Sequence, residues 1–407
     1  MSGWWILVTI KVLIIAAGVM TAAAYLVLLE RKLAAWIQDR VGPNRVGIPL
    51  TRIRLFGLGQ PLADGLKFIF KEEFTPAHVD RWLYWAAPVI ILTVSLAAFA
   101  VIPFGSVLPS SVGVEGERPI ELVLAPGVDV GLIFVFAMGS IAVYGVILGG
   151  WASNNKYSFL GALRSSAQLI AYELPLGLGI LGVVAATGSL DLRAIIAAQA
   201  ETGCWFLFSQ PLGFVVLVIA SFAEAARLPF DLPECEQELV GGYHTEYAGM
   251  KLLLFLVSEF LHMITGAFLI VILFLGGWHF WGLTGVGEEV GWFRAIVRVL
   301  VLLGKVFAVI LFFQVVRWSW PRFRFDQLMA FCWRVLLPLG MINLLAVAVL
   351  WECFISQAIW PGGLLAVSVA GWLVFGLSWY GLGCLRPTIA DNRPALSLMP
   401  DDIDWQV

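Results

Sequence analysis

Long apolar segments constrain this chain more than any other feature. A helix that crosses a bilayer needs roughly 20 apolar residues. Nine segments meet this requirement, near residues 4–29, 82–103, 132–150, 168–187, 211–229, 251–275, 296–316, 335–355 and 364–384. Hydrophobic residues make up 60% of the 407 residues and charged residues only 13%, and a soluble domain could not bury so much apolar surface. The pattern predicts an all-α polytopic membrane protein with about nine transmembrane helices.

The distribution of basic residues predicts the orientation of these helices. No basic residue precedes the first apolar run, which is also too long for a cleaved signal peptide, so we expect it to be the first span. With the N-terminus outside, the inner segments carry 19 of the 25 Lys and Arg residues, nine of them within 31–81, and the outer segments carry four. Because inner loops are enriched in Lys and Arg, we expect the C-terminus in the cytoplasm.

The chain shows neither an internal repeat nor a low-complexity linker, which indicates a single membrane domain over 1–407. Within it lie a first inner loop at 30–81, an acidic inner loop at 224–250, and an extra C-terminal span with a tail at 356–407. The five cysteines form no C-x-x-C pair, the four histidines are too few for facing haem ligands, and no phosphate loop is present. We therefore expect the chain to bind no metal, haem, flavin or Fe–S cluster of its own.

The first inner loop contains a short amphipathic pattern after Pro61. Its apolar face holds Leu62, Leu66, Ile69 and Phe70, and its polar face holds Asp64, Lys67 and Lys71. Such a segment is typical of a helix lying along the membrane surface. It could simply pair with anionic lipid, but the loop is long for a connector and mixes acids among its bases.

Two predicted spans carry ionisable residues. Glu173 precedes Pro175, which lacks the amide that would bond the Ala171 carbonyl, so we expect the helix to be loosened there. A lone buried carboxylate is costly unless water or a partner reaches it, which favours a function over a simple hydrogen bond to a neighbouring helix. Glu259 and His262 form an i,i+3 pair in a later span.

The stretch 224–251 holds six carboxylates against two basic residues. Glu224 and Arg227 could form an i,i+3 ion pair at a helix end, and the remaining acids could belong to a solvated loop. However, the inner surface of a membrane is negative and favours Lys and Arg. The acids therefore indicate a hydrated or partner-covered cavity. In the next inner loop, Arg317, Arg322, Arg324 and Arg334 alternate with aromatic residues, which by itself favours lipid anchoring.

Five blocks along the chain resemble the membrane subunit of respiratory complex I that joins the peripheral arm to the membrane arm, known as the H subunit in bacteria and as subunit 1 in mitochondria. The blocks are "ERKLAAWIQDRVGPNRVG", "GQPLADGLKFIFKE", "SNNKYSFLGALRSSAQLIAYELPL", "FAEAARLPFDLPECEQELVGGYHTEYAGMK" and "PRFRFDQLM". They cover all four inner loops, in order, over roughly residues 25 to 340.

The resemblance implies a proton-translocating NADH:quinone oxidoreductase in a bacterial cytoplasmic membrane, in which this subunit forms the quinone chamber with soluble subunits. Electrons would come from a partner's Fe–S cluster, so quinone would be a substrate and no residue here would be directly redox-active. Other membrane-arm subunits and lipid would be further partners, and nucleic acid would not. The implied chamber residues are Arg31, Asp64, Lys67, Glu234, Glu236 and Glu238. The implied proton path comprises Glu30, Glu173, Glu224, Arg227, Asp231 and Glu259.

Two positions depart from the family pattern. The family commonly has Asn where this chain has Ala226, and a small residue where it has Leu228. Three other classes of protein fit the residues less well. A secondary transporter should show related halves with broken helices, and a plain anchor would not need buried carboxylates. The homologous membrane subunit of proton-pumping hydrogenase complexes is the closest rival, but the complete first loop favours the quinone enzyme.

Overall fold

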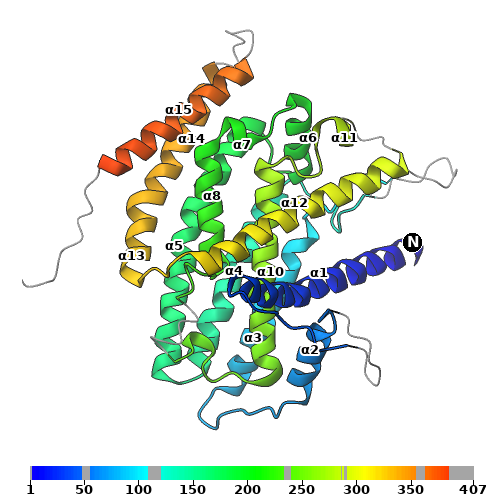
Figure 1. Cartoon of the computed structure of the whole chain (residues 1–407), viewed down its shortest axis with the longest axis vertical. Coiled ribbons are helices and arrows are strands. Elements are labelled where there is room, and N and C mark those ends of the chain that lie inside the picture. The colour runs from blue at the N-terminus through cyan, green and yellow to red at the C-terminus, as the bar shows by residue number, and fades with distance from the viewer. Residues whose placement is uncertain are drawn as a thin grey trace, which may run out of the picture.

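The computed structural model describes residues 2–47, 56–108, 121–232, 240–285, 287, 291–353 and 363–384. These residues form helices joined by turns and loops, and no β-strand occurs among them (Figure 1). The all-α prediction is confirmed.

Eight helices in the described part of the chain are long and apolar enough to cross a membrane. They are α1 (Ser2–Ile37), α3 (Arg81–Ala97), α4 (Gly131–Ala152), α5 (Lys156–Thr187), α10 (Gly249–Phe274), α12 (Trp292–Ser319), the continuous α13 and α14 (Phe325–Phe331 and Leu337–Trp351, joined by a π-helix at Cys332–Leu336) and α15 (Gly363–Cys384). Each overlaps one of the nine predicted spans, although α5 and α13 begin 12 and 10 residues before the predicted bounds.

The remaining predicted span, 211–229, is shorter than expected. Its helix α8 covers Pro211–Glu224, and the short α7 (Phe206–Ser209) precedes it. At ~1.5 Å per residue, 14 residues reach only about 21 Å of the ~30 Å hydrocarbon thickness. The chain turns at Ala226, whose φ of 49° is left-handed. Ala225, Ala226 and Arg227 are buried, and non-helical backbone at this depth is tolerated only inside protein or along a hydrated cavity.

The predicted surface helix is present as α2 (Gln60–Phe70). It begins with Pro61 in its first turn, where proline's fixed φ favours a helix start. Leu62, Ile69 and Phe70 expose 70%, 58% and 83% of their surface, as expected for an apolar face that lies on lipid. The other short helices are α6 (Leu192–Thr202), α11 (Trp281–Thr284) and 3₁₀ turns at Ala98–Ala100 and Gly242–His244.

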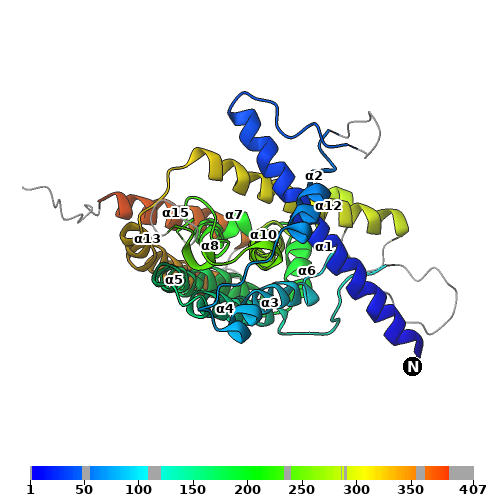
Figure 2. The same cartoon turned by 90° about the horizontal axis from the view of Figure 1, so that it is seen from below.

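Helix α10 forms the centre of the bundle. It packs against α1, α3, α8 and α12, and its second half is almost entirely buried. In the view of Figure 2, α3, α4, α5, α8 and α10 cluster together, while α1 and α12 run obliquely along one side. The α4–α5 contact is close because Gly150 lacks a Cβ where Ala162 approaches. This arrangement brings the ionisable residues of α5, α8 and α10 toward one interior space.

The expected loosening of the helix at Pro175 is wrong. Helix α5 continues through Pro175 to Thr187. The Ala171 carbonyl, which Pro175 cannot bond, accepts a hydrogen bond from the Cys332 thiol at 3.1 Å. The Tyr172 hydroxyl donates to the Leu328 carbonyl at 2.9 Å. The freed backbone acceptor is therefore satisfied by a neighbouring helix, which keeps α5 intact beside Glu173.

Candidate functional site: a carboxylate-lined cavity and its ion pairs

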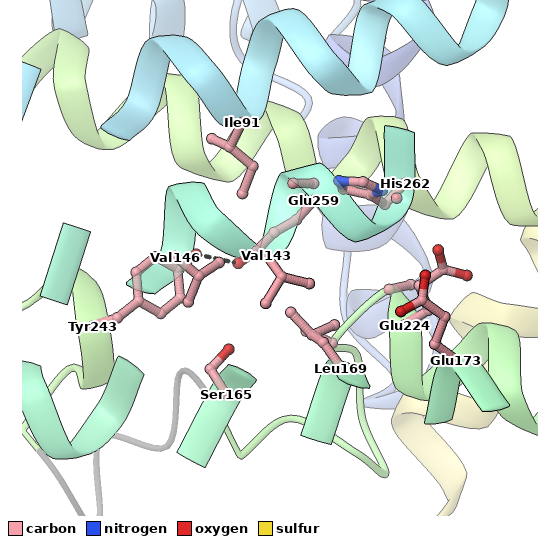
Figure 3. Close-up of a pocket in the computed structure, with 14 residues that line it drawn as sticks. Ile91, Val143, Val146, Ser165, Leu169, Glu173, Glu224, Tyr243, Glu259 and His262 are labelled. Atoms are coloured by element: carbon pink, nitrogen blue, oxygen red, sulfur yellow. Dashed lines mark hydrogen bonds between the residues drawn. The ribbon is translucent and has the colours of Figure 1, made fainter. Parts of the chain in front are cut away.

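A cavity of about 50 Å³ lies inside the bundle, between α3, α4, α5, α8, α10 and the Gly242–His244 turn (Figure 3). The polar side chains that line it are Ser165, Glu173, Glu224, Tyr243, Glu259 and His262. A cavity of this size has room for at least one water molecule, and its polar side chains offer hydrogen-bond partners for it. The cavity therefore offers space for water deep in a membrane protein.

Glu173 on α5 and Glu224 on α8 form one end of the cavity, where their carboxyl groups lie side by side in Figure 3. The Ser140 hydroxyl of α4 donates a hydrogen bond to Glu173 Oε1. The neighbouring Gly139 makes room for the second acid, since a Cβ there would lie 3.1 Å from Glu224 Oε1. Because both carboxyl groups face the same cavity, a water molecule in it can pass a proton between them.

Glu259 on α10 connects the cavity to a buried arginine. The Tyr243 hydroxyl donates to Glu259 Oε1 at 3.1 Å, and Arg227 Nη2 lies 3.6 Å from Glu259 Oε2. The Arg227 guanidinium also lies over the Phe260 ring, 4.1 Å from its centroid. About one turn further along α10, His262 Nε2 lies 3.0 Å from Ser95 Oγ of α3.

Arg227 also reaches Glu30 near the C-terminal end of α1. Its Nη1 lies 3.6 Å from Glu30 Oε2, and Arg317 Nη1 lies 2.6 Å from Glu30 Oε1. These contacts form one connected series of charges, which consists of Arg317, Glu30, Arg227 and Glu259. Each of the four side chains exposes less than a fifth of its surface. Buried charges are tolerated only when they are paired, so removing one member leaves the others uncompensated. Arg227 thus pairs with Glu30 and Glu259 of other helices rather than serving only a local helix-end pair.

The adjacent residue, Arg31, faces the surface helix. Its Nη1 lies 2.8 Å from Asp64 Oδ2, and the Gln60 amide donates to Asp64 Oδ1 at 2.9 Å. This pair is partly exposed, with Arg31 at 48%, so it contributes little to stability. Lys67 lies on α2 with an exposed side chain. Two consecutive residues of α1, Glu30 and Arg31, therefore face the buried charges and the surface helix respectively.

Asp231 forms a separate pair with the segment between α12 and α13. Arg322 Nη2 lies 3.0 Å from Asp231 Oδ2, and the Phe230 and Phe323 rings stack beside it. Asp231 is buried, but it is not among the described residues that line the cavity. The implied chamber residues Glu234, Glu236 and Glu238 lie outside the described residues.

Several members of the site were not predicted from the sequence. Arg317 and Arg322, taken together with other arginines as lipid anchors, each pair with a buried or nearly buried acid. The sequence did contain a signal for Arg317. Glu30 and Arg317 carry opposite charges, and each of them ends an apolar run. Ser140 and Tyr243 gave no such signal, since a single hydroxyl in an apolar run or turn is common. Among the described residues, no group of three or more His, Cys, Asp or Glu side chains could hold a metal ion.

Comparison with known proteins identifies the family. Residues 10–348 match the family described as NADH dehydrogenase. The chain is 46% identical to the H subunit of NADH-quinone oxidoreductase from Protochlamydia amoebophila, over 81% of this chain and 92% of that protein. It is 48% identical to the H subunit numbered 1 of the same enzyme from Geobacter metallireducens, over 82% and 93% of the two chains. It is 47% identical to NADH-quinone oxidoreductase subunit 8 of Thermus thermophilus, over 85% and 87%. The chain therefore belongs to the NADH dehydrogenase family of complex I membrane subunits, which includes the H subunit of NADH-quinone oxidoreductase.

Proposed function

We propose that this chain forms the quinone chamber of a proton-translocating NADH:quinone oxidoreductase together with soluble subunits, and that its buried carboxylates couple quinone reduction to proton movement. The names of the relatives support NADH:quinone oxidoreductase as the enzyme and a quinone as its substrate. The observation that carries the coupling is the series of buried ion pairs from Glu30 through Arg227 to Glu259 at the cavity. Glu30 is next in sequence to Arg31, which pairs with Asp64 on α2.

In this proposal the chamber borders the polar face of α2 and the inner end of α1. Arg31, Asp64 and Lys67 would line the access or headgroup path, together with the acidic segment that carries Glu234, Glu236 and Glu238. Reduction of a quinone takes up two electrons and two protons. The electrons would come from an Fe–S cluster of a partner, so this chain would supply binding, orientation and protons.

The geometry around Arg227 suits a charge relay. Its distances of 3.6 Å to both Glu30 and Glu259 exceed the ~2.7–2.9 Å of a charge-assisted hydrogen bond. A small shift of the guanidinium toward one carboxylate therefore strengthens that pair and weakens the other. A charge change in the chamber would reach Glu259 in this way, and Glu173 and Glu224 would take up or release a proton in response.

We further propose which faces of the subunit contact its partners and how it is oriented in the membrane. The inner face would dock the soluble Fe–S and quinone-site subunits, the sides would contact other membrane-arm subunits and lipid, and the outer face would stay largely bare. The protein would lie in a bacterial cytoplasmic membrane with its N-terminus outside and its C-terminus in the cytoplasm. The low number of Lys and Arg residues on the outer segments supports this orientation.

Replacing Glu173 by Gln tests the coupling role. Glutamine keeps the size and can accept the Ser140 hydrogen bond, but it does not titrate. We expect the Glu173→Gln complex to assemble and bind quinone, and its coupled turnover to fall about tenfold or more, equivalent to ~1.4 kcal/mol. The measurements are NADH:quinone turnover and proton pumping in reconstituted vesicles.

Asp326→Asn is the matched control. Asp326 is 70% exposed and pairs with Arg324 at the surface, so the same acid-to-amide change there should leave turnover unchanged. Wild-type turnover and pumping in Glu173→Gln would show that Glu173 is structural and would overturn the coupling proposal.

A further inference from the structure

A second cavity lies beside α6 and α11. Figure 1 shows these two helices at the opposite end of the bundle from α2. The volume of this cavity is about 330 Å³. The residues that line it come from the segment after α3, from α6, from the segments around α11 and from the start of α12. Its polar lining consists of Ser106, Arg193, Glu201, His279 and Arg298. The proposed quinone and proton chemistry uses none of these residues.

Arg298 is a buried cation in this cavity, with 3% of its surface exposed. Its Nε donates to the Thr284 carbonyl at 3.1 Å, and its Nη2 donates to the carbonyls of Gly285 and Gly287 at 3.1 and 2.9 Å. These bonds leave Nη1, with two N–H groups, unused among the described residues. None of the ion pairs formed in that part of the chain includes Arg298. A buried charge without a counter-charge is costly, so the site calls for an anion.

Two further buried groups lack partners in the same cavity, within the part of the chain that the structure describes. His279 is 3% exposed, and neither ring nitrogen has a hydrogen-bond partner. Ser106 is 4% exposed, and its hydroxyl is likewise unpartnered. Burial, followed by the charges of Lys305 and Arg298, lowers the pKa of His279, so its neutral ring can donate one N–H. Unsatisfied buried polar groups are rare in native proteins, and here they share one lining.

We propose that this cavity binds a phosphate group, either the headgroup of an anionic phospholipid or free phosphate. Arg298 Nη1, the His279 ring and the Ser106 hydroxyl supply donors to an oxyanion, and Arg193 adds a second guanidinium at the wall. Arg193 Nη1 is also paired with Glu121 at 2.6 Å, and the carboxylate of Glu201 stands at the exposed side of the lining. Among the described residues that line the cavity, two guanidiniums stand against one carboxylate, which favours an anion over a cation. Water could satisfy Ser106 and His279, but it would not neutralise Arg298.

The test uses the intact complex and two probes. Inorganic phosphate is titrated calorimetrically into detergent-purified complex from which lipid has been washed. In parallel, the complex is reconstituted in vesicles of phosphatidylcholine with phosphatidylglycerol, re-solubilised and washed, and the retained phosphatidylglycerol is counted by mass spectrometry. The variants are His279→Leu, Ser106→Ala and Arg298→Gln. The first two remove donors that hold no part of the backbone, so they keep the test valid if Arg298→Gln fails to assemble.

Arg294→Gln is the matched control, because Arg294 is exposed one turn before Arg298 on the same helix and does not line the cavity. We expect His279→Leu to weaken binding of one probe about tenfold or more, and Arg294→Gln to leave it unchanged. Saturable binding of inorganic phosphate identifies free phosphate as the ligand. Retention of phosphatidylglycerol without phosphate binding identifies a lipid headgroup. Equal binding of both probes by wild type, His279→Leu and Arg294→Gln would overturn the proposal.

Discussion

At the scale of single residues, Glu30 and Arg31 show how one short segment can serve two environments. Successive residues of a helix point about 100° apart, so Glu30 joins the buried charges while Arg31 pairs with Asp64 on α2. The family pattern implied roles for both residues. Their separate partners, however, depend on how α1 packs against α2 and α12.

Asp64 provides a test of the chamber at this scale. Asp64→Ala removes the partner of Arg31, so we expect slower quinone reduction by the complex, while NADH oxidation with a soluble acceptor at the peripheral arm stays at the wild-type rate. Lys67→Ala should act in the same direction. Asp326→Asn, at an exposed surface pair, is the control and should leave both rates unchanged. Loss of both activities together in Asp64→Ala would indicate failed assembly instead.

Ala226 is a residue whose type conflicts with its backbone. Its φ of 49° is left-handed, a conformation that Asn adopts more readily than Ala, and the family commonly has Asn there. We expect Ala226→Asn to stabilise the subunit by up to ~1 kcal/mol, because the cavity beside it leaves room for the longer side chain.

The measurement is the rate of thermal inactivation of the complex. Ala225→Asn is the control, since Ala225 has an ordinary φ of −70° and gains nothing from Asn. Equal or faster inactivation of Ala226→Asn relative to wild type would contradict the strain argument.

At the scale of elements, α15 is the part of the structure with no counterpart in the family match, which ends at residue 348. It contacts α7, α8 and α14. Gly371 is the point of closest approach, because a Cβ there would collide with the Ser209 carbonyl oxygen. The side chains of Cys204 and Ser368 are hydrogen bonded across the same interface.

Gly371→Leu should therefore displace α15 from α7. In a Ser368→Cys background, oxidation should link Cys204 to the cysteine introduced at position 368, and we expect Gly371→Leu to reduce this link several-fold. Peptide mass spectrometry measures the linked fraction. Gly376→Leu is the control, because nothing lies within 4 Å of a Cβ at that position. Equal linkage in both variants would show that Gly371 does not set the contact.

At the scale of the whole molecule, charge divides the two ends of the bundle. One end carries α2 and the Arg31–Asp64 pair, and the other carries the cavity around Arg298. Most Lys and Arg residues lie on the segments assigned to the cytoplasm. The positive-inside rule then predicts that the proposed quinone chemistry lies at the inner end and the proposed phosphate site at the outer end.

Cysteine labelling tests this orientation. Asp129 and Asn154 are exposed residues at opposite ends of α4. In a cysteine-free background, a membrane-impermeant maleimide should label the Asp129→Cys variant in whole cells. It should label the Asn154→Cys variant only after the membrane has been solubilised. The reverse pattern would invert the topology and place the soluble partners on the wrong face.

The sequence by itself determined the features that depend on local physics. Apolar runs of sufficient length specified the spans, since hydrocarbon excludes unpaired backbone groups, and the alternation after Pro61 specified the surface helix. The family blocks pointed to Glu30, Glu173, Glu224 and Arg227 as candidate site residues. From the sequence pattern alone, however, we predicted that the fifth span ends at residue 229, whereas α8 ends at Glu224. The pattern also predicted a loosened helix at Pro175, which the structure does not show.

Only the tertiary structure decided which groups meet. The Cys332 thiol satisfies the carbonyl freed by Pro175 although the partners are 161 residues apart in sequence, and Arg317 completes the Glu30 pair from another helix. The carboxylate cavity exists because Gly139 and the buried turn at Ala226 leave space between α4, α5 and α8. Periodicity reports which face of a helix is apolar, but not which neighbour lies against that face. Pairing of buried polar groups depends on that neighbour, so it could be assigned only after the helices were packed.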